Sequence, residues 1–401
     1  MNAKLKFFSS LLAVVLLSQC KKDELKQVEI YDNNFLTLLI KQGVDTDGDG
    51  KISYTEAAAV KTIDVSGKNI SSLSGIEAFV NLETLKCAIN SLSGLNVSKN
   101  TSLSYLDCDQ NQLTSLNVSN NHALTFLSCF SNQITNLDIS ENIALKHFNC
   151  GINQISHLYV SENVALTDLW FTGNMLSEID VTKNISLESL LCNYNALSSL
   201  NISNNTKLTE LQSERNQFTN LDVSNAPSLK IFFCGWNKLT NLDVSKNPSL
   251  FYLECNDNLL TGLDLSRNYS LFVLYFQNNQ ISTLDVSKNT SLNSILCSGN
   301  PLTALDFSKN PDLEGLWCEN IGLTTLDLAL NTKLNALYCG GNKFTTLDLT
   351  KNTSLRFLQI NDMPSLYKVC VWALPFPIPG FQIYSSSNSP NVYFSTDCGS
   401  Q

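Results

Sequence analysis

The chain has 401 residues, of which 43% are hydrophobic and 15% are charged, and its formal net charge is −10 at neutral pH. It is long enough to bury a large core, and no basic patch offsets its acidity. These properties disfavour nucleic acid as a partner.

Residues 1–20 have the pattern of a secretory signal peptide, because two lysines precede an apolar run over residues 7–17 that is too short to span a membrane with ease. The sequence Leu-Ser-Gln-Cys that ends at Cys20 resembles the lipobox of bacterial lipoproteins, whose cysteine receives lipid and becomes the new N-terminus. Gln19 departs from that pattern, which normally has a small residue there. The resemblance implies an exported outer-membrane lipoprotein, anchored at Cys20 and facing the cell exterior. The alternative is a plain signal peptide cleaved elsewhere.

Residues 21–31 are predicted to form a tether, and residues 32–60 are predicted to form an N-terminal cap. Apolar residues at helical spacing indicate a short amphipathic helix over residues 33–42. The residues that follow match an EF-hand loop, with ligand positions at Asp45, Asp47, Asp49, Lys51, Ser53 and Glu56.

This loop pattern suits calcium, which takes six to eight oxygen ligands. Three aspartates and Glu56 offer carboxylates, the Lys51 carbonyl offers a further oxygen, and Ser53 can hold a water. We expect calcium as a structural cofactor, because one loop alone and three methionines in the whole chain do not fit the paired sensors that expose a Met-rich groove. An acidic turn without metal is the alternative.

Residues 82–354 consist of thirteen consecutive units of 21 residues, and residues 60–366 as a whole are predicted to form a solenoid. The unit pattern is L-x-x-L-x-C-x-x-N-x-L-x-x-L-D-V-S-x-N-x-S, which resembles the leucine-rich repeat with cysteine in place of the third leucine. Its alternating apolar residues predict one short strand per unit. Stacked units therefore give a parallel β-sheet on the concave face, with extended return segments because so short a unit leaves little room for a helix.

Cysteine occupies position 6 of ten units, where position 1 is the leucine that opens the unit. Cβ vectors in adjacent units are parallel and about 4.8 Å apart, which is wider than a disulfide requires. We expect these thiols to be small buried hydrophobes, and zinc is disfavoured because no C-x-x-C pair is present. The column comprises Cys87, Cys108, Cys129, Cys150, Cys192, Cys234, Cys255, Cys297, Cys318 and Cys339.

Two polar columns accompany the cysteines. Asparagine recurs at position 9, from Asn90 to Asn342, and we expect it to bind turn backbones of its own and adjacent coils. Aspartate recurs at position 15, as in Asp138 and Asp264, and should form an exposed file of like charges. A solvated face is expected there, and cation binding along the file is the alternative.

The cysteine column, the 21-residue period and the L-D-V-S-K-N return together resemble the internalin family of leucine-rich repeat adhesins of bacterial cell walls. The resemblance covers residues 60–360. It implies a solenoid fold and, by analogy, a role in adhesion.

Positions 3, 5, 7 and 8 should project from the sheet into solvent, where folding does not demand aromatic residues. Mutual packing that stiffens the sheet is the alternative explanation for them. An aromatic surface suits protein and polysaccharide ligands alike. The candidate ligand surface comprises Tyr105, Phe126, Phe130, Trp170, Tyr194, Phe233, Trp236, Tyr252, Tyr275, Trp317 and Tyr338.

Residues 367–401 are predicted to form a small β cap, with strand-like segments at 381–384 and 392–394. Cys370 and Cys398 lie outside the cysteine column and are the plausible disulfide in an exported protein.

No catalytic residues are predicted, because the three histidines fall at different positions of their units and none has an obvious nucleophile and carboxylate partner. The sequence therefore favours a calcium-capped, membrane-anchored surface protein without catalytic activity that binds a protein or polysaccharide in adhesion. A glycan-binding accessory protein of a nutrient-uptake system and a purely structural envelope protein are the alternatives.

Overall fold

The computed structural model describes residues 26–384, 389 and 392–398. The predicted signal peptide, Cys20 and residues 21–25 of the predicted tether lie outside the described residues. By its internal contacts, the chain divides into two units, Met1–Leu176 and Ser177–Gln401.

The first unit begins with two helices, α2 (Asn33–Lys41) and α3 (Tyr54–Ala59), and has a 3₁₀ turn, η1 (Ile76–Ala78). The helix predicted over residues 33–42 is confirmed. Its N-cap is Asp32, whose side chain accepts hydrogen bonds from two amides of the first turn. The same carboxylate accepts a 2.8 Å hydrogen bond from the Ser71 amide and so fastens the cap to the first repeat.

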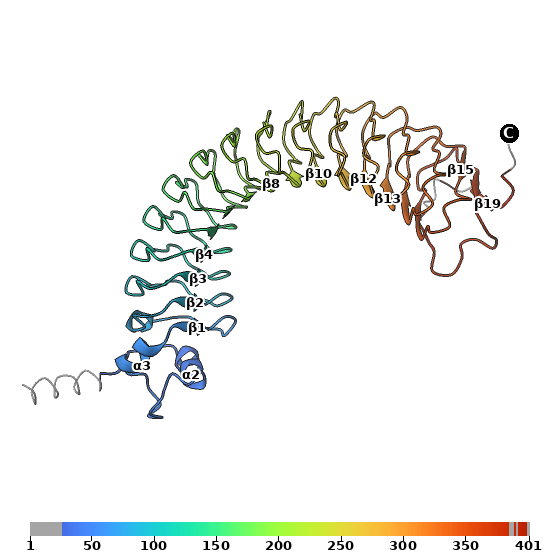
Figure 1. Ribbon diagram of the computed structural model, residues 1–401. Coiled ribbons are helices and arrows are strands. Elements are labelled where there is room, and N and C mark those ends of the chain that lie inside the picture. Colours follow the sequence, from blue (N-terminus) through green and yellow to red (C-terminus); the bar gives the residue numbers. More distant parts are fainter. Residues whose placement is uncertain (1–25, 385–388, 390–391, 399–401) are drawn as a thin grey trace, which may run out of the picture. The chain divides into compact units, whose positions relative to one another are not determined.

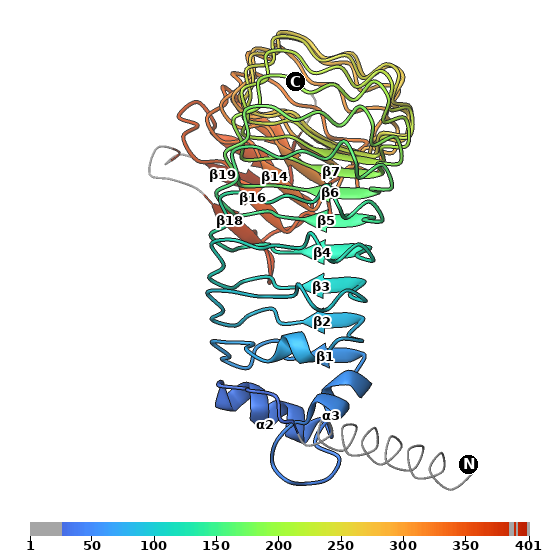
Figure 2. The same ribbon diagram turned by 90° about the vertical axis from the view of Figure 1, so that its left-hand side faces the viewer.

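One three-residue strand per coil follows in the first unit, as predicted, and each strand pairs in parallel with the next (Figure 1). The register between β1 and β2 is 22 residues, as in Thr62 with Thr84, and it is 21 residues from β2 onward. In Figure 2 these strands lie above one another on one side of the coils. Their bounds are β1 (Thr62–Asp64), β2 (Thr84–Lys86), β3 (Tyr105–Asp107), β4 (Phe126–Ser128), β5 (His147–Asn149) and β6 (Asp168–Trp170).

The second unit repeats this arrangement and adds a second ladder of strands at its C-terminal end. Its main ladder comprises β7 (Ser189–Leu191), β8 (Glu210–Gln212), β9 (Ile231–Phe233), β10 (Tyr252–Glu254), β11 (Val273–Tyr275), β12 (Ser294–Leu296), β13 (Gly315–Trp317), β14 (Ala336–Tyr338), β16 (Phe357–Gln359) and β18 (Gln382–Tyr384). The second ladder comprises β15 (Thr346–Asp348), β17 (Lys368–Cys370) and β19 (Tyr393–Ser395).

Residues beyond 366 continue both ladders, because β18 pairs with β16 and β19 pairs with β17. The two strand-like segments predicted there are confirmed. The structure has a disulfide between Cys370 and Cys398, with the two sulfurs 2.10 Å apart. Among the described residues, the return segments form a ladder of strands at the C-terminal end of the second unit. In the first unit, the return segments form one isolated bridge, between Asn96 and Asn117.

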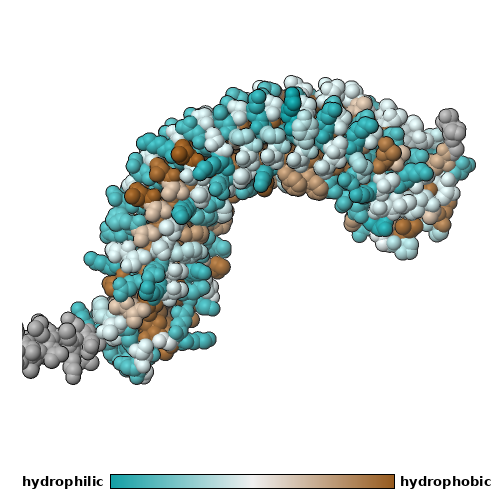
Figure 3. Space-filling view, in the orientation of Figure 1, coloured by the Kyte–Doolittle hydropathy of each residue, from teal (hydrophilic) through white to brown (hydrophobic). Residues whose placement is uncertain are grey.

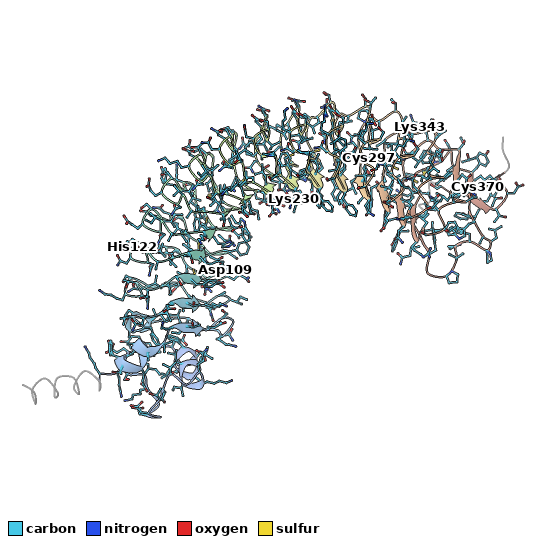
Figure 4. All side chains as sticks on the ribbon, viewed as in Figure 1. Asp109, His122, Lys230, Cys297, Lys343 and Cys370 are labelled. Carbon is cyan, nitrogen blue, oxygen red and sulfur yellow. A yellow bond between two sulfur atoms is a disulfide. The ribbon has the colours of Figure 1, made fainter. Side chains whose placement is uncertain are left out.

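The ten column cysteines are buried between the strands and the return segments, and none is disulfide-bonded. Cys297 lies inside its coil in Figure 4. Each thiol stands where the usual leucine-rich repeat has its third leucine, and a thiol is also a weak hydrogen-bond donor. For example, the Cys108 Sγ donates to the Ser128 carbonyl at 3.3 Å. Burial raises the pKa of the Cys108 thiol well above its ordinary value. The prediction that the thiols are small buried hydrophobes is confirmed.

Because the thiolate is the reactive species, the ten column thiols should not react with an aromatic disulfide reagent while the protein is folded. We expect all ten to react in denaturant, as counted by the colour released. Rapid reaction of several of them in the native protein would contradict their burial.

The position-9 asparagines bind backbone in the way the sequence predicts. Asn111 donates from Nδ2 to the carbonyls of Cys87, Cys108 and Asp109, at 3.0, 3.1 and 3.0 Å. Its Oδ1 accepts from the Leu92 amide at 3.0 Å. Each amide therefore ties its own coil to the preceding one and satisfies groups that the sharp turn leaves without partners.

A second asparagine ladder, at position 19, is not predicted by the sequence reasoning above. Asn121 is fully buried, and its Nδ2 donates to the Val97 and Asn100 carbonyls at 3.0 and 2.9 Å. Asn142 makes the equivalent pair of bonds one coil later. The sequence shows that asparagine recurs at position 19 every 21 residues. Because asparagine also suits an exposed turn, this recurrence alone does not indicate burial.

The position-15 aspartates are exposed, as predicted, and each caps its own turn. Asp138 Oδ1 accepts from the Ser140 amide at 2.9 Å, and Asp264 Oδ1 accepts from the Ser266 amide at the same distance. These hydrogen bonds lower the pKa of both carboxyls. Within the described part of the chain, no helix has the length and apolar character needed to cross a bilayer.

Candidate functional site

We define the strand face as the side chains at positions 3, 5, 7 and 8 of each coil. All eleven predicted aromatic residues lie outside the buried core. Tyr194 and Trp236 are 53% and 46% exposed, and the other nine are partly buried. Figure 4 shows Asp109 on the strand side of the first unit and His122 on the opposite side.

In the first unit, the strand-face rings cover one another. Tyr105 and Phe126 stack at 4.1 Å between centroids, and Phe126 stacks on His147 at 4.5 Å, both with planes 4° apart. Trp170 meets His147 edge-on at 4.5 Å, and the Lys86 ammonium lies 5.5 Å from the Tyr105 centroid. Because neighbouring rings occupy the ring faces, mutual packing accounts for Tyr105, Phe126 and Trp170.

His147 is a member of this stack that the sequence reasoning did not include. Burial lowers the pKa of its imidazole, and the neighbouring Asp168 carboxylate, 3.9 Å away, acts in the opposite direction. The available signal was its position 3, which it shares with Tyr105 and Phe126.

In the second unit, the strand face holds a cation between two rings. The Arg215 guanidinium carbon lies 4.1 Å from the Trp236 centroid and 5.2 Å from the Tyr194 centroid. All three residues stand at position 8 with positive φ, 51° for Arg215 and 55° for both aromatics. That backbone conformation favours Gly, Asn and Asp, and costs other residues about 1–2 kcal/mol each. The turn itself therefore does not require these bulky side chains.

The remaining rings of the predicted ligand surface in the second unit form two clusters, one with edge-on contacts and one with nearly parallel rings. Phe233, Tyr252 and Tyr275 form a chain with centroids 4.7 and 5.4 Å apart and interplanar angles of 70° and 83°. Trp317 and Tyr338 are 5.5 Å apart with planes 15° apart. In Figure 3, the apolar side chains of these coils are interspersed with polar ones.

Carboxyl groups are interspersed among the rings of both units. Burial raises the pKa of Asp107 and Asp109 in the first unit. In the second unit, burial and then the nearby Glu254 carboxylate raise the pKa of Glu214 to about 7. The aromatic criterion used on the sequence missed Glu214 and Arg215, although both stand at strand-face positions.

The predicted calcium loop lies between α2 and α3. Asp45, Asp47 and Asp49 each bring a carboxylate oxygen within 4.8 Å of the others. Gly50, with φ of 81°, allows the turn, and its amide donates to Asp45 Oδ2 at 3.0 Å. This convergence of hard oxygen ligands fits a calcium ion.

Glu56 closes the loop from the start of α3. Its carboxylate accepts from the Thr46 amide at 2.7 Å and from the Ser53 amide at 2.8 Å. Burial acts to raise the pKa of Glu56, but these hydrogen bonds outweigh it and lower the pKa to about 2. The carboxylate is therefore charged at neutral pH. The carbonyl of the buried Ile52 accepts a hydrogen bond from the Val28 amide at 2.8 Å. The segment before α2 therefore supplies the short β contact of the loop.

Comparison with solved structures gives three informative matches. The functional domain of InlJ (internalin J) from Listeria monocytogenes, which includes a cysteine ladder, is 33% identical, with a TM-score of 0.75 over 80% of this chain and 70% of that chain. The leucine-rich effector protein YopM from Yersinia pestis is 21% identical, with a TM-score of 0.67 over 88% and 93% of the two chains. A leucine-rich repeat protein from Leptospira interrogans is 22% identical, with a TM-score of 0.64 over 85% and 97%.

No profile of a known protein family and no curated protein sequence matches the chain. The YopM and Leptospira matches show the fold alone. The match to internalin J is closer in sequence and includes the column of buried cysteines described above. The chain belongs to the leucine-rich repeat family that includes internalin J.

Proposed function

We propose that this protein is a non-catalytic, adhesion-type binding protein of the cell surface, and that it binds a macromolecule through the strand face of its second unit. The observation that carries the proposal is the Arg215 site, where two large rings occupy backbone positions that the coil fills more easily with glycine or asparagine. Partly exposed aromatic residues beside arginine are typical of protein-binding surfaces.

The proposed surface location is based on the N-terminal sequence. In this proposal, residues 1–20 are an export signal and Cys20 is the lipidated residue. The likeness to an internalin supports an exported protein. A protein ligand is favoured over a polysaccharide by the similar proteins, which are leucine-rich repeat interaction proteins, so the glycan-binding accessory role is the second candidate.

An unbiased capture experiment tests this proposal, with the folded full chain as bait against host-cell surface proteins and a glycan array. We expect the captured partner to bind at least tenfold more weakly when Phe233→Ala and Trp317→Ala are combined, because both rings lie on the strand face. Binding would be measured by biolayer interferometry.

The matched control combines Tyr159→Ala and Tyr269→Ala, which removes two aromatic rings from the return side, where they are 78% and 52% exposed. We expect this variant to bind like the wild type. Equal loss in both variants, or none in the first, would remove the strand face from the proposal. Failure to capture any partner would favour a purely structural envelope protein.

We further propose a structural calcium ion in the N-terminal cap. Asp45, Asp47 and Asp49 would hold it with their carboxylates, Lys51 with its carbonyl, Ser53 through a water and Glu56 with its carboxylate. The ion would offset part of the converging negative charge and tie α2 to α3, next to the first coil. The support is the convergence of three carboxylates within 4.8 Å.

Calcium should therefore stabilise the fold measurably. With a Kd on the order of 10⁻⁴ to 10⁻³ M, 10 mM calcium should add about 1.4–2.7 kcal/mol relative to chelator. We expect Glu56→Gln to abolish this difference in melting temperature, whereas Glu162→Gln, an exposed carboxyl of a later coil, should retain it. Identical melting curves with calcium and with chelator would contradict the site.

A further inference from the structure

Five side-chain oxygen atoms on the strand face of the second unit have no hydrogen-bond partner in the described part of the chain, and three of them lie in one column. These three are Oε2 of Glu214, Oδ1 of Asn256 and Oε1 of Gln277. With Gly235, these residues fill position 7 of four consecutive coils, which succeed one another at about 4.8 Å. A buried acceptor without a donor costs about 1–3 kcal/mol, so this column of acceptors favours a ligand that supplies donors.

The orientation of Asn256 is fixed by its neighbours. Its Nδ2 donates to Asp257 Oδ2 at 2.7 Å, so exchanging the two amide atoms would place oxygen against a carboxylate. Its Oδ1 points at Gly235, where a Cβ atom would lie only 2.4 Å away. Glycine at 235 therefore makes room for an acceptor that no described residue satisfies, and Asn256 itself is only 3% exposed.

The carboxyl groups around this column form no ion pair within the described residues. Burial and the Glu254 carboxylate raise the pKa of Glu214, and burial and the Asp257 carboxylate raise that of Glu254. Arg215, which follows Glu214 in sequence, lowers the pKa of that carboxyl by its charge, but its guanidinium lies between the Tyr194 and Trp236 rings.

The rings beside the column are suited to a cation. Phe233, Tyr252 and Tyr275 meet by their edges at 70° and 83°, so ring faces are not all covered by neighbouring faces, as they are in the first-unit stack. The site occupied by Arg215 shows how this same face holds a guanidinium, 4.1 Å from a ring centroid.

We propose that the column from Glu214 to Gln277 binds a basic segment of the partner protein, with a lysine or arginine side chain that donates to the unpartnered oxygens beside the Phe233 and Tyr252 rings. This inference rests on the proposed binding function and names the chemistry of its partner. Lysine and arginine are donors only and carry positive charge, which complements a site with several unpartnered acceptors and two carboxyl groups. A neutral glycan supplies donors but leaves the two carboxylates without a countercharge.

A weaker copy of the arrangement stands five coils later, at Glu319, Gly340 and Asn361. Asn361 Oδ1 again points at the glycine, where a Cβ would lie 2.6 Å away, and its Nδ2 donates to Asp362 at 2.8 Å. The Asn361 Oδ1 and the Gln359 Oε1 are again without a partner among the described residues. In this copy, however, the Glu319 carboxylate already accepts a hydrogen bond from Ser298, and Gln359 stands where the first column has Glu254. The copy therefore serves as an internal control.

The test uses the full chain and a fluorescent octapeptide of alternating arginine and serine, with binding followed by anisotropy. Its controls are the same peptide with citrulline, which keeps the shape of arginine without the charge, and a labelled neutral glucan. We expect the arginine peptide to bind at least tenfold more tightly than the citrulline peptide. In the wild type, its affinity should fall with added salt.

The combined Glu214→Gln and Glu254→Gln substitutions should weaken arginine-peptide binding at least tenfold. Two matched variants should stay within threefold of the wild type: Asp243→Asn with Asp264→Asn, which removes the same charge from the return side, and Glu319→Gln in the second copy. The glutamine substitutions relieve like-charge repulsion, so they should not unfold the protein, and each single variant should show part of the loss.

Equal weakening by the return-side variant would reduce the effect to nonspecific charge and overturn the proposal. So would equal affinity for the citrulline peptide, or glucan binding that depends on Glu214. The two proposals fail differently. A captured partner that depends on Phe233 and Trp317 but ignores the glutamine substitutions would leave the binding surface in place and refute only its basic partner.

Discussion

Replacing Asn132 with alanine should lower the free energy of unfolding by about 3 kcal/mol or more. Asn132 is 9% exposed, and its Nδ2 donates to the Cys108 and Cys129 carbonyls at 3.1 Å each and to the Phe130 carbonyl at 3.4 Å. Its Oδ1 accepts from the Leu113 amide at 3.0 Å. Alanine would leave the Leu113 amide without its acceptor, which costs about 1–3 kcal/mol. It would also remove three hydrogen bonds to carbonyls, each worth about 0.5–1.5 kcal/mol, although those carbonyls keep donors from Asn111, Asn153 and Gln110.

Asn136 provides a matched control in the same coil, because it is the same residue type on an exposed stretch of the return. Asn136→Ala should change the free energy of unfolding by less than about 0.5 kcal/mol. Urea unfolding followed by circular dichroism would measure both variants. Equal effects at the two sites would mean that the buried amide ladder does not tie the coils together.

Removing the disulfide between Cys370 and Cys398 should be the second large effect. The bridge spans 28 residues and joins β17 to the chain just after β19, at the terminal edge of the second ladder. Closing a loop of this size restricts the unfolded chain and stabilises the fold by about 3.5 kcal/mol in the chain-entropy treatment. Serine at both positions should lower the urea midpoint of the last coils by a corresponding amount.

The buried column offers the control for that experiment. Reducing agent should lower the midpoint of the wild type as much as the double serine variant does, and should leave the double variant itself unchanged, because the ten column thiols are already free. A midpoint that responds to neither treatment would show that the C-terminal coils hold without the bridge.

Much of the fold could be predicted because one 21-residue period fixes several structural features at once. The alternation of Leu85 and Cys87 with polar neighbours placed a strand in each coil, and the same spacing placed the thiols in a buried column. The position-9 amides followed from the need to satisfy turn backbones. The buried role of Asn121 was missed because asparagine is equally common in solvated turns.

The state of the aromatic residues could not be predicted from their positions. Phe126 and Tyr252 both stand at position 3, yet the first stacks face to face with its neighbours and the second meets rings by their edges. The geometry of a ring contact depends on the side-chain rotamers and on the neighbouring residue in the next coil. The repeat pattern of one coil specifies neither of these. Likewise, the left-handed backbone of Arg215, Tyr194 and Trp236 follows from the turn geometry and not from their residue types.

The calcium loop differs from the repeats in what could be predicted. Its motif predicts calcium ligands because their spacing is set by coordination chemistry, and the structure brings three of the predicted ligands, Asp45, Asp47 and Asp49, together. The β contact of Ile52 with Val28 could not be inferred, because it depends on a segment outside the motif.

The central claim is that the strand face of the second unit, and not the return side, binds the partner. Hydrogen–deuterium exchange of the full chain, alone and saturated with the partner captured in the screen, tests this most directly. The account predicts slower exchange in peptides that contain β8–β11 and the following position-8 turns, with the return segments at Asp243 and Asp264 unchanged. Protection confined to those return segments, with β8–β11 unaffected, would contradict it.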